Sequence, residues 1–109
     1  MPRLAVGVSR RGSLLEPLFQ HQVPVALVFS DRLCNGLDLA ARHGVPGICL
    51  PRRFGAAFDR RRYTQHLLKL LLRHRIDAVY LAGYKTVLDA EFFRVYDRRV
   101  LNAHPALLP

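Results

Sequence analysis

Asn102 and His104, near the end of the sequence, are the residues best suited to acid–base chemistry. They follow directly after the apolar pair Val100 and Leu101. An imidazole can act as a general acid near neutral pH, and a side-chain amide can donate a hydrogen bond to an oxyanion. The spacing therefore predicts a catalytic pair above one crevice. A purely structural role for two such residues at the end of a strand is also compatible with the sequence.

A short polar turn near the start of the sequence is the second candidate for chemistry. The turn Ser9–Ser13 contains one glycine, Gly12, and links the apolar run Leu4–Val8 to a predicted helix. Backbone N–H groups at such a position suit a phosphate. The turn matches neither GxGxxG nor a Walker loop, so binding of a dinucleotide or ATP is not predicted. A tight turn that ends in a capping serine explains the same residues equally well.

The charge of the chain favours an anionic partner. Among its 109 residues, 17 are lysine or arginine and 8 are aspartate or glutamate, which gives a formal net charge of +9. A phosphate, a nucleotide or a nucleic acid would satisfy that charge. Nearly all the cations are arginines, which is also typical of a generally arginine-rich surface. Both interpretations stay open here, and a nucleic-acid partner is not excluded.

Composition narrows the class of protein. Hydrophobic residues make up 50% of the chain, enough for the core of one domain. The apolar runs fall short of the roughly 18 residues of a membrane span, and the first run is too short for a signal peptide. Cys34 and Cys49 form neither a disulfide framework nor a metal-ligand spacing. We expect one soluble, cytoplasmic domain over residues 1–109, with no metal and no membrane contact.

Apolar runs and helix-like stretches alternate along the chain. The runs predict strands at Leu4–Val8, Val25–Ser30, Val45–Leu50, Ala78–Ala82 and Val100–Asn102. The stretches between them predict helices at Ser13–His21, Leu37–His43, Arg61–Arg75 and Asp89–Tyr96. In the first helix, Ser13 and Glu16 would form a capping box. Pro46 makes Val45–Leu50 an edge strand. This order predicts an α/β fold with a doubly wound, mostly parallel, Rossmann-like sheet of about five strands.

In such a sheet, ligands bind beyond the carboxyl ends of the strands, near the point where the strand order reverses. The segments that fall there are Ser9–Ser13, Ala82–Leu88 and Asn102–Pro109. Their predicted convergence is the strongest argument for a site that the residues alone provide.

With these segments placed, the sequence resembles the N-terminal half of the phosphoribosylglycinamide formyltransferase family, the folate-dependent enzymes of purine synthesis. The likeness follows the family order across nearly the whole chain. Its most specific part is the final nonapeptide. The residues that carry it are Leu4–Leu15 (LAVGVSRRGSLL), Val28–Arg32 (VFSDR), Phe58–Asp59, Asp77–Tyr84 (DAVYLAGY) and Leu101–Pro109 (LNAHPALLP).

The resemblance implies a reaction and a role for each part of the site. The amine of glycinamide ribonucleotide would attack the formyl carbon of 10-formyltetrahydrofolate. Asn102 would then donate to the oxyanion, and His104 would protonate the leaving folate nitrogen. The substrate phosphate would be held by Arg11, Gly12, Ser13 and Leu14. The folate would be lined by Arg60 or Arg61, Lys85, Thr86, Val87 and Leu88. No metal takes part.

The sequence also departs from the family pattern. Arg10–Arg11 stands where the family has Gly-Asn, and Leu14 where it has asparagine. Lys85–Thr86 replaces Met-Arg, and Ala106 replaces serine. The chain also stops soon after a strand, and the family's catalytic aspartate falls beyond the point that corresponds to Pro109. We therefore expect an N-terminal fragment that lacks the C-terminal catalytic portion and has little or no activity of its own.

Other functions remain possible at this stage. The chain could belong to another formyl-handling enzyme, such as a formyltetrahydrofolate deformylase or a methionyl-tRNA formyltransferase. It could also be a non-catalytic module that binds nucleotide or RNA through its arginines. An exposed sheet edge would favour self-association in any of these cases.

Overall fold

A five-stranded parallel sheet forms the centre of the fold. A computed structural model describes residues 2–52 and 58–103 of the chain. The sheet has the strand order β3-β2-β1-β4-β5, with all neighbouring strands parallel. The predicted α/β class is confirmed, as is the edge position of β3. The elements in chain order are β1 (Leu4–Val8), α1 (Glu16–Gln20), β2 (Leu27–Ser30), α2 (Asn35–Arg42), β3 (Gly47–Cys49), α3 (Arg60–Arg73), β4 (Ala78–Ala82), α4 (Ala90–Val95) and β5 (Val100–Ala103).

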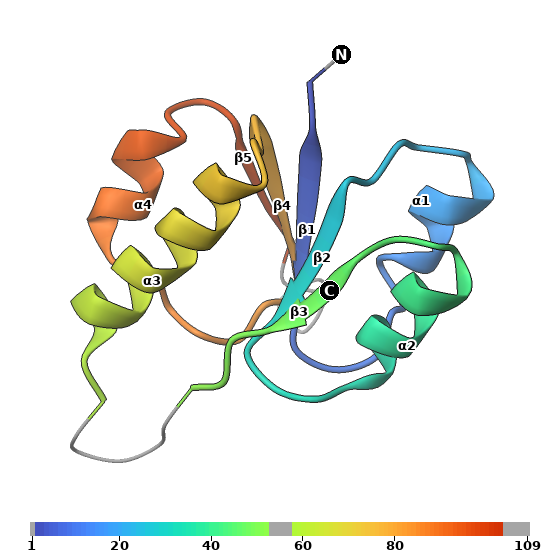
Figure 1. The fold of residues 1–109 in the computed structure, drawn as a ribbon, viewed down its shortest axis with the longest axis horizontal. Helices are drawn as coiled ribbons and strands as arrows, with labels where there is room; N and C mark the ends of the chain where they lie inside the picture. The colour runs from blue at the N-terminus through green and yellow to red at the C-terminus, as the bar shows by residue number, and fades with distance from the viewer. Residues whose placement is uncertain (1, 53–57, 104–109) are drawn as a thin grey trace.

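Two hydrophobic layers hold the helices to the sheet. Helices α3 and α4 cover one face, and α1 and α2 cover the other (Figure 1). Because side chains alternate along a strand, β1 serves both layers: Ala5 faces α3 and α4, whereas Val6 and Val8 face α1 and α2. From α3, Leu67 and Leu71 are fully buried and belong to the layer between this helix and the sheet.

Element ends shift from the sequence prediction by a few residues, and local chemistry explains several of the shifts. Strand β3 begins at Gly47 instead of Val45, because Pro46 has no N–H to give to the ladder. Helix α3 ends at Arg73 instead of Arg75, and Arg75 adopts a left-handed backbone with φ of 56°. Helix α4 begins at Ala90 instead of Asp89, because Asp89 caps the helix and its carboxylate accepts from the N–H of Glu91.

The predicted capping box in the first helix is wrong. The helix begins at Glu16 after Leu15, and no side chain caps it. The N–H groups of Leu15 and Glu16, which a serine cap would engage, both donate to the Gly12 carbonyl at 3.1 and 2.8 Å. The Ser13 hydroxyl is therefore not used in the helix, and α1 is only five residues long.

The strand order reverses between β1 and β4. The chain runs outward from β1 to β2 and β3, then returns to the other side of β1 with β4 and β5. In an open parallel sheet this reversal separates the loops at the carboxyl ends of the two central strands and leaves a crevice there. Here those loops are the segment after Val8 and the segment after Ala82.

Gly7 in β1 provides a test of this packing. A Cβ atom at Gly7 would lie 2.6 Å from Cζ of Phe29 and 3.2 Å from Cδ2 of Leu81. Since the Phe29 ring is fully buried and cannot move aside, Gly7→Ala should lower the free energy of unfolding by about 1–3 kcal/mol. The measurement is urea unfolding.

Gly47→Ala in the edge strand β3 is the matched control. Its new Cβ would meet only Leu37 closely, at 3.2 Å from the flexible Cδ2 atom. We expect a clearly smaller loss of stability. Equal unfolding midpoints for the two variants would contradict the tight contact between β1 and Phe29.

Candidate functional site

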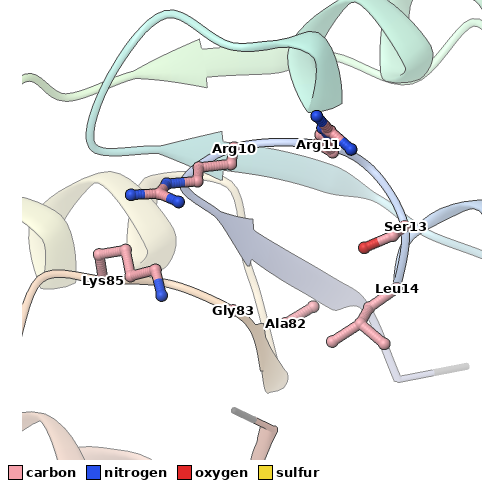
Figure 2. Close-up of a pocket in the computed structure, with 7 residues that line it drawn as sticks. All are labelled: Arg10, Arg11, Ser13, Leu14, Ala82, Gly83 and Lys85. Carbon is pink, nitrogen blue, oxygen red and sulfur yellow. The ribbon is translucent and has the colours of Figure 1, made fainter. Parts of the chain in front are cut away.

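A cationic crevice lies where the strand order reverses. It has a volume of about 420 Å³ and separates the loop after β1 from the loop after β4 (Figure 2). Basic side chains come from both loops, and none of the described residues that line the crevice carries a carboxylate. The lining residues are Arg10, Arg11, Ser13, Leu14, Ala82, Gly83 and Lys85. The structure thus brings together the first two of the segments that the sequence predicts to converge.

The loop after β1 carries unused donors, and two of its residues, Ser13 and Leu14, line this crevice. Among residues 2–52 and 58–103, no hydrogen-bond partner is found for the N–H groups of Gly12, Ser13 and Leu14. The Ser13 hydroxyl is exposed beside them and points toward the crevice in Figure 2. With a helix as short as α1, the loop N–H groups and the arginines must provide most of the attraction for an anion.

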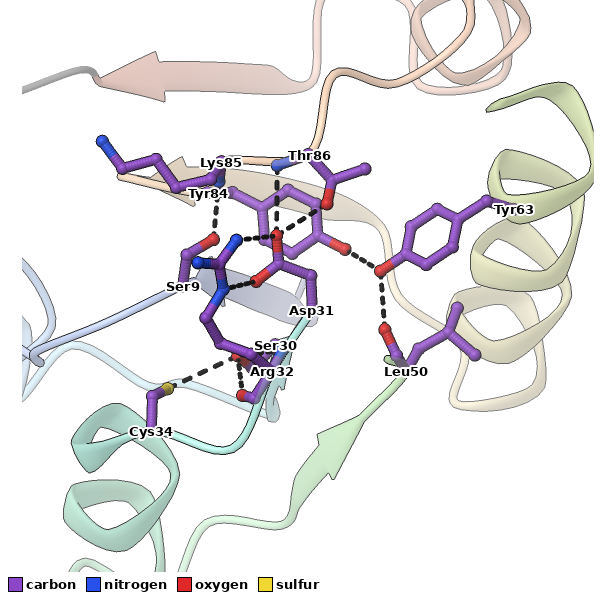
Figure 3. A network of polar contacts seen from close by, with 10 residues as sticks. All are labelled: Ser9, Ser30, Asp31, Arg32, Cys34, Leu50, Tyr63, Tyr84, Lys85 and Thr86. Atoms are coloured by element: carbon purple, nitrogen blue, oxygen red, sulfur yellow. Dashed lines mark hydrogen bonds and ion pairs between the residues drawn. The ribbon is translucent and has the colours of Figure 1, made fainter. Parts of the chain in front are cut away.

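A buried carboxylate connects the loops around the crevice. Asp31, directly after β2, is only 1% exposed. Its Oδ2 accepts from the N–H of Thr86 at 3.1 Å and from the Thr86 hydroxyl at 2.6 Å. It also forms an ion pair with Arg32, whose Nε lies 3.0 Å from Oδ1. Next to it, the Ser9 hydroxyl oxygen accepts the N–H of Lys85 at 2.6 Å (Figure 3). The ends of β1, β2 and β4 are therefore joined by polar contacts.

The electrostatics of Asp31 favour its charged form. Burial by itself would raise the pKa of Asp31, but hydrogen bonds from Arg32, Thr86 and Ser9 outweigh it and hold the pKa below its usual value of 3.8. The carboxylate is therefore ionised at neutral pH. It works as a fixed acceptor for Thr86 and Arg32, and it is not poised to transfer a proton.

Two tyrosines support the loop after β4 from the other side. The hydroxyls of Tyr63 in α3 and Tyr84 are hydrogen-bonded to each other, and the Tyr63 hydroxyl donates to the Leu50 carbonyl at 2.7 Å. Burial raises the pKa of Tyr63 to about 12, and it raises the pKa of Tyr84 as well. Both rings are therefore neutral and act as structural contacts beneath the loop.

A second, smaller cavity adjoins the crevice. It has a volume of about 110 Å³, and Lys85 lines both spaces. Asn102 reaches this cavity from β5, where it is paired in register with Leu81 of β4. The lining residues are Leu81, Tyr84, Lys85, Thr86, Val87, Leu88, Phe93 and Asn102. The predicted oxyanion donor and the predicted folate loop therefore share one cavity.

Other predicted site residues fall elsewhere. His104 lies outside the described residues. Arg60 and Arg61 are exposed in the first turn of α3 and line neither space. Thr86 is buried, with its hydroxyl bonded to Asp31, so its side chain is used within the protein. The roles of these residues stay predictions.

Asp31 is the residue that sequence reasoning missed. It appears within the VFSDR segment, but no role was predicted for it. A carboxylate directly after the predicted strand Val25–Ser30 was the available signal, because such a position lies at the ligand-binding edge of a parallel sheet. Its partner Thr86 is distant in sequence, so the contact itself could not be read from the sequence.

In residues 2–52 and 58–103, no three side chains of His, Cys, Asp or Glu gather as a metal site would require. None of the helices in those ranges is long and apolar enough to cross a membrane.

Comparison with known proteins decides the family. The family model described as "Formyl transferase" matches residues 3–109. The chain belongs to the formyl transferase family. One curated relative is the chloroplastic phosphoribosylglycinamide formyltransferase of Arabidopsis thaliana. It is 33% identical to this chain, and the match covers 98% of this chain and 39% of the plant protein.

Solved structures show the same fold. The phosphoribosylglycinamide formyltransferase of Streptococcus pneumoniae is 34% identical, with a TM-score of 0.84 over 100% of this chain and 59% of the other. A formyltetrahydrofolate deformylase of Burkholderia mallei is 24% identical, with a TM-score of 0.75 over 93% of this chain and 37% of its own; this likeness concerns the fold alone. The formyl transferase chain thus spans 39% of the plant relative and 59% of the streptococcal one.

The buried Asp31 gives a pH-dependent prediction. Asp31→Asn replaces the carboxylate that accepts hydrogen bonds from Thr86 and Arg32 with a neutral amide. We therefore expect a loss of about 2–3 kcal/mol in the free energy of unfolding at pH 7. Because the folded state lowers the pKa of Asp31, its carboxylate stabilises the fold above about pH 4. This stabilisation disappears as the pH falls through the folded-state pKa.

Unfolding of the wild type and the variant should therefore be compared at pH 7 and at successively lower pH. The stability difference should narrow below about pH 4. Asp97→Asn, at an exposed turn position, is the control and should change stability by less than about 0.5 kcal/mol. A difference between wild type and Asp31→Asn that stays constant down to pH 2 would refute the role given to the charge.

Proposed function

We propose that this chain forms the N-terminal, substrate-binding portion of a phosphoribosylglycinamide formyltransferase. Such an enzyme moves a formyl group from 10-formyltetrahydrofolate to the amine of glycinamide ribonucleotide in purine synthesis. The cationic crevice beside β1 and β4, next to the cavity that Asn102 reaches, is the observation that supports this assignment most directly. The names of the relatives agree with it.

The crevice would hold the phosphate of glycinamide ribonucleotide. The unused N–H groups of Gly12, Ser13 and Leu14 and the guanidinium of Arg11 provide donors of the kind that bind phosphate oxygens. The side chains of Arg10, Arg11 and Lys85 give the described lining of the crevice a positive charge. Arg11 would thereby compensate for the asparagine that the family has at this position.

The transfer step would take place at the adjoining cavity. Attack of the substrate amine on the formyl carbon gives a tetrahedral intermediate. Asn102 would donate a hydrogen bond to its oxyanion, and His104 would give a proton to the leaving folate nitrogen. The position of Asn102 in register with Leu81, at the wall of that cavity, supports this role.

The folate would occupy the side of the cavity formed by the loop after β4. Val87 is 61% exposed there, and the buried Leu88 contributes an apolar wall. Arg60 or Arg61, in the first turn of α3, would contact the folate from beyond this loop. No step in this reaction requires a metal.

The proposal also concerns the cellular location and the self-association of the protein. We assign it to the cytoplasm, where its small-molecule substrates would be found. β5 is an edge strand, and its Leu101 is 65% exposed, which supports self-association along this edge. The region 1–109 would be the nucleotide-binding part of the enzyme, with the remaining catalytic groups supplied from outside these residues.

Substrate binding tests the assignment. Glycinamide ribonucleotide, titrated calorimetrically into the 109-residue chain, should bind, and Arg11→Gln should weaken binding about tenfold through loss of a charge-assisted hydrogen bond. Arg73→Gln, in the last turn of α3, is the control and should leave affinity unchanged.

A single-stranded RNA should be titrated in parallel at two salt concentrations. Tight, salt-sensitive RNA binding without any response to glycinamide ribonucleotide would refute the enzyme assignment and indicate a nucleic-acid-binding module.

Turnover gives a separate prediction. The resemblance places the carboxylate that would act together with His104 outside the 109 residues. The 109 residues alone should therefore bind substrate but transfer formyl groups slowly or not at all. A formyl-transfer assay showing turnover near that of a full-length relative would contradict this.

A further inference from the structure

Basic side chains face the crevice from opposite sides. Arg10 and Arg11 belong to the loop after β1, and Lys85 belongs to the loop after β4 (Figure 2). An anion bound to the N–H groups of the first loop would therefore meet the Lys85 loop across the crevice. Such an arrangement allows a phosphate to be contacted from both loops at once.

The backbone at Lys85 is fixed on this wall. Its N–H donates to the Ser9 hydroxyl oxygen at 2.6 Å, and the next residue, Thr86, is held by the buried Asp31 through two hydrogen bonds. The side chain of Lys85 thus starts from a defined point beside the first loop. Fewer degrees of freedom are lost when a ligand binds to a group whose backbone is already held in place.

The ammonium group of Lys85 is available for a ligand. The side chain is exposed, and in Figure 3 it extends away from the Asp31 cluster. Across the described ranges, no carboxylate forms an ion pair with Lys85. A lysine ammonium is a compact cation with rotatable donors, which suits a phosphate group.

We propose that Lys85 is a ligand of the substrate phosphate and closes the crevice from the β4 side. This inference rests on the proposed function, which places that phosphate in the crevice. It gives Lys85 a role different from the folate contact that the sequence suggests, and it makes the residue a determinant of selectivity for a phosphorylated substrate. Lys85 lines both spaces, so the two roles can be separated only by experiment.

The experiment uses inorganic phosphate as the probe and the full 109-residue chain. Lysines occur only at positions 69 and 85, so the side-chain methylene signals of both can be followed by NMR. Titration should shift the signals of Lys85 and leave those of Lys69, exposed on α3, in place. Lys85→Met should weaken phosphate binding about tenfold, and Lys69→Met should not change it.

A second variant separates charge from shape. Lys85→Arg keeps the positive charge, so it should retain most of the phosphate affinity that Lys85→Met loses. A general disturbance of the loop would instead weaken phosphate binding in both variants. Unchanged phosphate affinity in Lys85→Met, together with weakened affinity in Arg11→Gln, would overturn the role of Lys85 and leave the proposed function standing. If Lys85→Met binds phosphate normally but binds 10-formyltetrahydrofolate more weakly than the wild type, the phosphate role of Lys85 is overturned as well. If the wild type binds no phosphate at all, both proposals fail.

Discussion

The hydrogen bonds between Asp31 and Thr86 are the interaction on which the site depends. They connect the end of β2 with the loop after β4, at 3.1 and 2.6 Å, across more than fifty residues of sequence. With the Ser9 contact to Lys85, they set the separation of the two loops that form the crevice. A buried carboxylate is costly unless it is fully paired, and here the donors from Thr86 and Arg32 provide that pairing. The same contacts that stabilise the charge therefore shape the binding site.

The site combines buried groups, which hold the loops in place, with exposed cations that line the crevice. The paired tyrosines and Asp31 are buried and hold the loop after β4 in place. The cations Arg10, Arg11 and Lys85 are exposed and line the crevice. Such a division is suited to binding a phosphate, because backbone donors fix its position and mobile cations supply charge. The family resemblance gives a Gly-Asn pair at the positions of Arg10 and Arg11, so we expect charge to contribute more to phosphate binding in this chain.

The sequence was sufficient for the architecture and for part of the site. The alternation of apolar runs with helix-like stretches predicts a parallel sheet, because each helix can connect two parallel strands. Turn residues or charged residues mark the ends of the runs. The capping box at Ser13 failed, because local pattern does not reveal that the Gly12 carbonyl already takes the relevant N–H groups. The contact between Asp31 and Thr86 could not be predicted either, since it depends on the crossover that brings β4 beside β1. Sequence reasoning therefore located the loops correctly but missed the interaction that joins them.

In the proposed function, the crevice between the loops after β1 and β4 holds the phosphate of glycinamide ribonucleotide. A crystal structure of the 109-residue chain with that nucleotide tests this proposal most directly. We expect phosphate oxygens within hydrogen-bond distance of the backbone N–H groups of Gly12, Ser13 and Leu14, with the glycinamide amine directed toward Asn102. A phosphate bound on a different surface, or an amine directed away from β5, would contradict it.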